Sequence, residues 1–142
     1  MQIKVVTVYV TDQERARAFY TEKLGFKLRD DAPYGPDFRW LTVVSPEDEG
    51  TELYLAHQNR YPGAAAFREA MYSGGIPFVG FATDDMEGLH SNLKGNGVTF
   101  TKEPAEQPYG GIGAVIDDGC GNLLNLSQEA GTASFSDSGR NT

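Results

Sequence analysis

The stretch VYVTDQERARAFYTEKLGFKL, residues 8–28, decides the fold, because it predicts a strand, a helix and a second strand in immediate succession. β-Branched residues over 3–10 favour a strand, and Thr11–Asp12 at its end is typical of a helix N-cap. Small and apolar side chains then recur at helical spacing from Gln13 to Lys23, and Gly25 is a typical C-cap. The segment supplies a scaffold and contains no obvious catalytic group.

The rest of the first half predicts three strands, at 26–31, 38–45 and 51–57. Turn-forming residues separate them at 33–37, and the acidic run PEDEG at 46–50 reads as a solvated turn. The first half is therefore predicted to be βαβββ.

The second half repeats this order, beginning with IPFVGFATDD at 76–85. Thr11 and Asp12 correspond to Thr83 and Asp84, and Gly25 to Gly97, each 72 residues later. The strands GGIGAVIDD and NLLNLSQ then stand where 38–45 and 51–57 stood in the first half. Self-similarity at a fixed offset indicates an internal duplication.

The chain is predicted to form one domain over 1–128, with module one at 1–58 and module two at 76–128. Between them, Pro62 and the Gly74–Gly75 pair bracket a linker helix within 59–75. The tail, 129–142, is rich in Ser, Gly and Thr, and we expect it to be flexible.

Composition limits the possible partners. The 142 residues carry a net charge of −8 with no basic cluster, so we expect no nucleic-acid partner. No apolar run approaches the roughly 20 residues of a membrane span, and the first residues lack the order of a signal peptide. With one cysteine, Cys120, placed in a turn as a small packed residue, we expect a cytoplasmic protein.

Two tandem βαβββ modules that open with VYVTDQERARAFYTEKLGF and close with DDGCGNLLNL resemble the vicinal oxygen chelate superfamily. Its members include glyoxalase I, extradiol dioxygenases, epimerases and the bleomycin and fosfomycin resistance proteins. The resemblance covers residues 3–128 and implies an α+β, glyoxalase-like fold, in which curved sheets surround a cleft. It also implies a homodimer, because members of this size commonly complete their clefts across a two-fold interface.

The resemblance further implies four metal-ligand positions, which fall at Val5, Glu52, Phe78 and Asn125. Only Glu52 could coordinate a divalent transition metal strongly, so we expect no metal and no other cofactor. A divalent metal at an unorthodox site that includes Glu52 is the alternative. His57 and His90 are not expected to replace the missing ligands, since one lies on the opposite strand face and the other in a helix outside the sheet.

Strand alternation places further residues on the face that carries these positions. The predicted ligand-binding cleft comprises Val5, Thr7, Tyr9, Trp40, Glu52, Tyr54, Phe78 and Asn125. Trp40 and Arg39 point to opposite faces, and the sequence leaves open which of them faces the cleft. A mixture of aromatic rings and few polar groups is typical of small-molecule sites, although the same rings could simply fill a core.

We expect metal-independent binding of a small, partly apolar or aromatic molecule. The alternative is a lyase, isomerase or dioxygenase-type enzyme of the same fold, with Glu52 as a general base or as part of an unorthodox metal site. Glu52 could equally be a carboxylate that accepts a hydrogen bond from Asn125 or from a ligand. A third possibility is a protein whose role is to pair with itself or with a partner.

Overall fold

The computed structural model describes residues 1–131 and contains two four-stranded sheets. The first module comprises β1 (Val5–Val10), α1 (Gln13–Ala18), η1 (Phe19–Lys23), β2 (Lys27–Pro33), β3 (Arg39–Ser45) and β4 (Asp48–His57). After α2 (Ala64–Ser73), the second module comprises β5 (Val79–Ala82), α3 (Met86–Gly95), β6 (Thr99–Glu106), β7 (Ile112–Asp117) and β8 (Leu123–Gln128). The α+β fold of two βαβββ modules is therefore as the sequence predicts.

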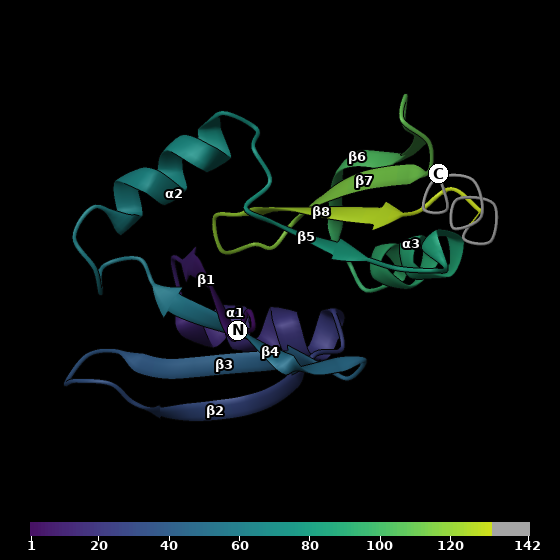
Figure 1. Cartoon of the computed structure of the whole chain (residues 1–142). Coiled ribbons are helices and arrows are strands. Elements are labelled where there is room, and N and C mark those ends of the chain that lie inside the picture. The colour runs from purple at the N-terminus through teal and green to yellow at the C-terminus, as the bar shows by residue number, and fades with distance from the viewer. Residues whose placement is uncertain (132–142) are drawn as a thin grey trace.

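Each sheet is mixed, and its first strand lies beside its last. The strand orders are β1-β4-β3-β2 and β5-β8-β7-β6, with the β1–β4 and β5–β8 pairs parallel and the others antiparallel. Figure 1 shows the two sheets as separate layers, with α2 beside β1 and distant from α3. The two modules pack together through their apolar sides, and α2 lies next to β1.

The core lies on the helix-facing side of each sheet. Val8, Val10 and Leu55 are fully buried, in agreement with the strand alternation expected for β1 and β4. Phe26, which follows η1, packs against Phe81 of β5 with ring centroids 5.1 Å apart. The two modules therefore share one continuous apolar core.

Polar contacts close the junction between the modules. The Tyr20 hydroxyl donates to Asp118 Oδ2 at 2.7 Å in a buried position, and Asn122 Nδ2 donates to the Tyr9 carbonyl at 2.8 Å. The Thr11 amide donates to the Cys120 carbonyl at 3.1 Å. The turn before β8 is thus attached to the β1–α1 connection of the other module.

Three local details differ from the expected pattern. The helix expected over 13–23 changes at Phe19 into the π-helical turn η1, in which the Leu24 amide bonds to the Phe19 carbonyl. The acidic run at 46–50 is a turn only in part, because β4 already begins at Asp48. In the second module the helix is capped by Asp85 and not by Asp84, since the Asp85 carboxylate accepts from the Gly88 amide.

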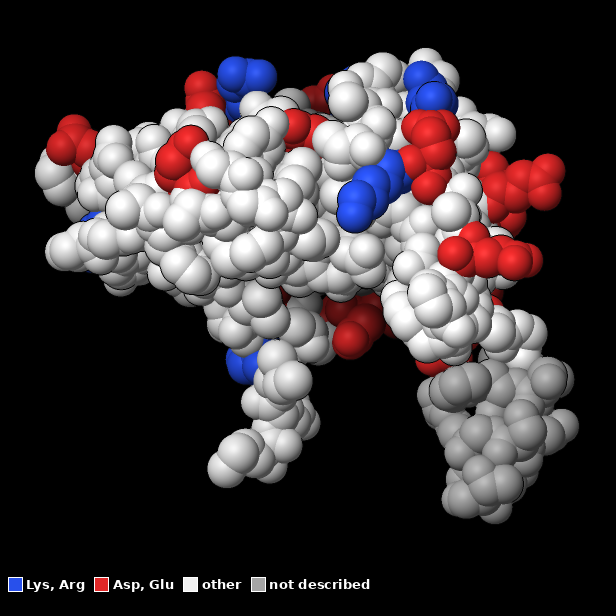
Figure 2. All heavy atoms as spheres, turned by 90° about the horizontal axis from the view of Figure 1, so that it is seen from above, with Lys and Arg blue, Asp and Glu red and all other residues white. Residues whose placement is uncertain are grey.

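Membrane and surface properties follow from the same elements. None of the helices within residues 1–131 is long and apolar enough to cross a membrane. On the face drawn in Figure 2, the Lys and Arg side chains are scattered and lie close to acidic groups, and a broad uncharged area occupies the middle of the face. The tail predicted to be flexible lies outside the described residues from 132 onward.

Candidate ligand-binding site

The open face of the first sheet, opposite α1, gathers most of the predicted cleft residues. Strand pairing sets Val5 beside Glu52, Thr7 beside Tyr54, and Thr42 of β3 beside Tyr54. Neighbouring residues of paired strands share a face, so Tyr9 of β1 and Trp40 of β3 lie on this side as well. The sheet thus brings together the first-module part of the predicted set.

Aromatic rings cover this face in a connected cluster. Trp40 packs against Tyr54 with ring centroids 4.2 Å apart and ring planes tilted by 35°, and Tyr9 contacts Phe78 edge-on at 6.0 Å. The Tyr54 and Tyr61 hydroxyls are 3.4 Å apart, and the Tyr61 ring lies 6.4 Å from that of Tyr9. Burial, followed by the Tyr61 hydrogen bond, raises the pKa of Tyr54, so its hydroxyl stays protonated at neutral pH.

Four members of the cluster were not foreseen from the sequence. They are Tyr34 from the β2–β3 turn, Arg60 and Tyr61 from the β4–α2 connection, and Phe67 from α2. Phe67 is 51% exposed and touches both Tyr9 and Phe78. The aromatic residues within 59–75 were the available signal, but the segment reads as a linker when its helix is considered alone.

Trp40 faces this cluster, and Arg39 points the other way. Arg39 donates to Asp31 and Glu14 on the side of α1, and its main chain is bonded to Gln13. Because Arg39 holds a bidentate contact with Asp31, the pKa of that carboxyl lies below its usual value. Of these two consecutive residues of β3, Trp40 therefore faces the cluster, which the sequence alone left open.

Glu52 lies on the open face but is only 7% exposed. Its polar neighbour is Arg29, with Nε 3.7 Å from Glu52 Oε1. A register shift between Leu28 and Asp30 forms a bulge, which lets Arg29 reach Glu52 while Asp30 reaches the Trp40 indole. Within residues 1–131 the side-chain partner of Glu52 is Arg29 and not Asn125, so of the two acceptor roles considered for this carboxylate, only the one toward a ligand stays open.

The four positions implied for a metal are paired differently in the two modules. Val5 and Glu52 are direct strand partners, whereas Asn125 pairs with Gly80, two residues beyond Phe78. Val5 and Phe78 carry no donor atom, and an arginine neighbours the one carboxylate. This donor set does not fit a divalent transition metal.

Neither histidine joins the site. His57 lies against Phe38 with ring centroids 5.3 Å apart, and its Nδ1 accepts from the Asn59 amide. His90, on α3, contacts Glu103 and the Phe100 ring. Both histidines are placed on the sides that strand and helix periodicity predict.

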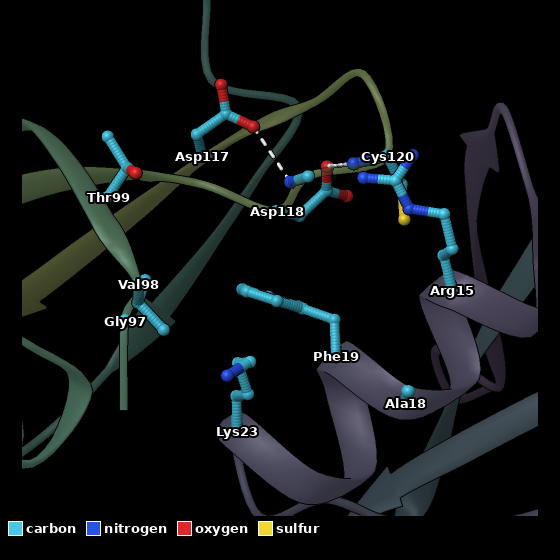
Figure 3. Close-up of a pocket in the computed structure, with 11 residues that line it drawn as sticks. Arg15, Ala18, Phe19, Lys23, Gly97, Val98, Thr99, Asp117, Asp118 and Cys120 are labelled. Atoms are coloured by element: carbon cyan, nitrogen blue, oxygen red, sulfur yellow. Dashed lines mark hydrogen bonds between the residues drawn. The ribbon is translucent and has the colours of Figure 1, made fainter. Parts of the chain in front are cut away.

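A separate hollow of about 350 Å³ lies where α1 and η1 meet the second module. Figure 3 shows Arg15, Phe19 and Lys23 on one side, with Asp117, Asp118 and Cys120 on the other. Asp118 accepts from the Cys120 and Asn122 amides and from Tyr20, which makes it a structural centre of the turn. Burial raises the pKa of the Cys120 thiol to about 12, so the thiol is protonated and unreactive at neutral pH.

A second hollow, of about 320 Å³, opens between the modules. It is walled mainly by apolar side chains, among them Val6, Phe26, Leu53 and Phe81. Its polar residues, which include Thr51 and Glu52, come from the start of β4 and the end of β3. It lacks the stacked rings that distinguish the open face.

Two tandem βαβββ modules, each forming a mixed four-stranded sheet, define the glyoxalase-like class of fold. The sequence model of the Glyoxalase/Bleomycin resistance protein/Dioxygenase superfamily matches residues 2–126. The chain belongs to this superfamily.

Its relatives include proteins of related size. The uncharacterised protein YurT of Bacillus subtilis (strain 168) is 45% identical over 130 residues, which are 91% of this chain and 100% of YurT. UcmS2, whose crystal structure is known, is 34% identical in sequence to this chain. The two structures superpose with a TM-score of 0.77, over 89% of this chain and 97% of UcmS2. TnmS3, an antibiotic binding protein from Streptomyces sp. CB03234, is 30% identical, with a TM-score of 0.73, covering 92% and 97%.

Proposed function

We propose that the protein binds a planar, partly aromatic small molecule on the open face of the first sheet, without a metal. The observation that carries the proposal is the close Trp40–Tyr54 contact, 4.2 Å between centroids, beside the partly exposed rings of Tyr9 and Phe78. Clustered aromatic rings on a sheet face offer an apolar surface with polar edges, which suits a planar ligand. The similarity to an antibiotic binding protein supports binding as the role of this fold here.

The donor chemistry supports a metal-free site. Val5 and Phe78 cannot coordinate an ion, and Arg29 already compensates the charge of Glu52. A base at Glu52 would act beside this cation, and among residues 1–131 it has no hydrogen-bonded partner that could relay a proton. Ligand binding requires only the residues described for this face, whereas catalysis would also require a proton relay at Glu52. We therefore favour binding.

We also propose a homodimer. Phe67 and Tyr34 remain exposed at the rim of the aromatic cluster, and an exposed apolar rim of this kind favours association. Sedimentation at micromolar concentration should give about twice the 15.5 kDa chain mass. A clean monomer would contradict the dimer without affecting the binding site.

The binding proposal is tested by calorimetry with 2-naphthamide, a neutral planar probe. Replacing Trp40 by Leu should weaken binding by about tenfold, because one stacked ring is worth roughly 1.4 kcal/mol. The matched control is Tyr109→Leu, since Tyr109 is an 83% exposed ring outside the cluster. Equal affinity of the Trp40 variant and the wild type would refute the site.

A further inference from the structure

Arg60 stands at the edge of the aromatic cluster with its guanidinium held between two rings. The guanidinium carbon lies 4.6 Å from the centroid of Tyr34 and 4.8 Å from that of Tyr61. Tyr34 in turn contacts Trp40 at 6.0 Å, and the Tyr61 hydroxyl lies 3.4 Å from that of Tyr54. Arg60 is thus one ring away from Trp40, through Tyr34, and one ring away from Tyr54, through Tyr61.

The charge of Arg60 is not compensated by an acid of the described chain. Within residues 1–131, no carboxylate forms an ion pair with it, although the chain as a whole carries a net charge of −8. The Asp30 carboxylate does have a partner in the cluster, because it accepts a hydrogen bond from the Trp40 indole Nε1 at 3.4 Å. An unpaired cation thus lies at one end of the ring surface, and a carboxylate lies beside Trp40.

Stacking fixes the orientation of a guanidinium without using its donors. Both ring contacts are made through the π faces, and the N–H groups radiate in the guanidinium plane, where they match the fork of a carboxylate. Because Tyr54 stays protonated, the Tyr54–Tyr61 hydroxyl pair adds a further neutral donor at the same end. These groups would all favour a negatively charged oxygen.

We propose that Arg60 selects aromatic ligands that carry an anionic oxygen, such as a carboxylate or an ionised phenol, and orients that oxygen away from Asp30. The inference rests on the proposed function, because it concerns a ligand stacked on the same rings. Arg60 then acts as a specificity-determining residue, and the stack supplies affinity that does not depend on charge.

The test compares two probes of the same shape, 2-naphthoate and neutral 2-naphthamide, by calorimetry. The wild type should bind the naphthoate about tenfold more tightly, as expected for one charge-assisted hydrogen-bonded contact at a half-exposed site. Arg60→Gln should abolish this preference and leave the naphthamide affinity within about threefold. Arg60→Lys should retain only part of the preference, because an ammonium lacks the planar fork.

The control is Lys94→Gln, which changes the net charge by the same amount but lies on α3 in an exposed pair with Glu103. It should keep the full preference for the naphthoate. Trp40 is the only tryptophan in the chain, so the single indole N–H signal in a ¹H–¹⁵N spectrum reports whether each probe reaches this face.

The outcomes separate the two proposals. Equal binding of both probes by the wild type, or an unchanged preference in Arg60→Gln, would overturn the role of Arg60 and leave the aromatic site standing. Failure of both probes to shift the Trp40 signal or to bind would overturn the proposed function and the role of Arg60 together. A preference lost equally in Lys94→Gln would assign it to net charge and also overturn the role of Arg60.

Discussion

Glu52 occupies one of the four positions that the family resemblance implies for metal ligands, but its polar neighbour is an arginine. It pairs in register with Val5 and Val44, and its charge faces Arg29, whose side chain is 43% exposed. At 3.7 Å, and with the arginine end of the pair open to solvent, this ion pair contributes little to stability, because water solvates the arginine when the partner is lost.

Replacing Glu52 by Gln should therefore change the free energy of unfolding by less than about 1 kcal/mol. Urea unfolding checks this, with Glu49→Gln as the matched control, since Glu49 forms an exposed pair with Lys27. A loss above about 3 kcal/mol would instead place Glu52 in a buried structural network.

Cys120 predicts a dependence of stability on alkaline pH. Its pKa rises from 9.0 to about 12 through burial, so between these values the folded chain binds more protons than the unfolded chain. The free energy of unfolding must then fall as pH rises, by up to about 1.4 kcal/mol per pH unit for one group. The buried Tyr20 phenol, whose pKa is also raised, adds to the fall at higher pH.

The measurement is urea unfolding at pH 8, 9, 10 and 11 for the wild type and Cys120→Ala. The substitution shifts stability at every pH, but it should make the decline above pH 9 shallower. Identical slopes in both proteins would show that the thiol does not carry the effect.

At the scale of elements, the helix N-caps test the equivalence of the two modules. Asp85→Ala should cost about 1 kcal/mol, because the Gly88 amide loses its acceptor at the start of α3. Asp84→Ala is the control and should cost less than about 0.5 kcal/mol, as a surface change outside the cap. Thermal unfolding of both variants distinguishes them, and a larger loss in Asp84→Ala would contradict Asp85 as the cap.

Elements with a strong local signal could be predicted from the sequence. The valines of β1, the Asp12 cap and the glycines after each helix define the βαβββ order without any tertiary information. The π-helical turn at Phe19 and the bulge at Arg29 could not be predicted, because both depend on packing against the rest of the sheet. The bulge matters most, since it supplies the cation beside Glu52.

The candidate site was predictable only where it lies on strands. Tyr9, Trp40 and Tyr54 follow from alternation, once the pairing of β3 with β4 is known. Tyr61, Phe67 and Arg60 lie in the connection after β4, and nothing local to that segment indicates that it folds back onto β1. Long-range packing decides this part of the site.

At the scale of the whole molecule, the junction between modules should make unfolding a single transition. Tyr20→Phe removes the buried hydrogen bond to Asp118 and should cost about 2 kcal/mol, as for a charged acceptor that loses a donor. Tyr72→Phe removes the exposed hydrogen bond to the neighbouring Asp117 and should cost less than about 0.5 kcal/mol. Circular dichroism and Trp40 fluorescence should give coincident urea curves, whereas two separate transitions would mean that the modules unfold independently.

The same bond orders events during synthesis. Tyr20 leaves the ribosome 98 residues before Asp118, which at about 5–20 residues per second is a delay of roughly 5–20 s. Throughout that interval the apolar side of η1 has no second module to cover it, so a nascent first module exposes apolar surface to the solvent. Because the two modules share one core, the first module completes its packing only after the second has been synthesised.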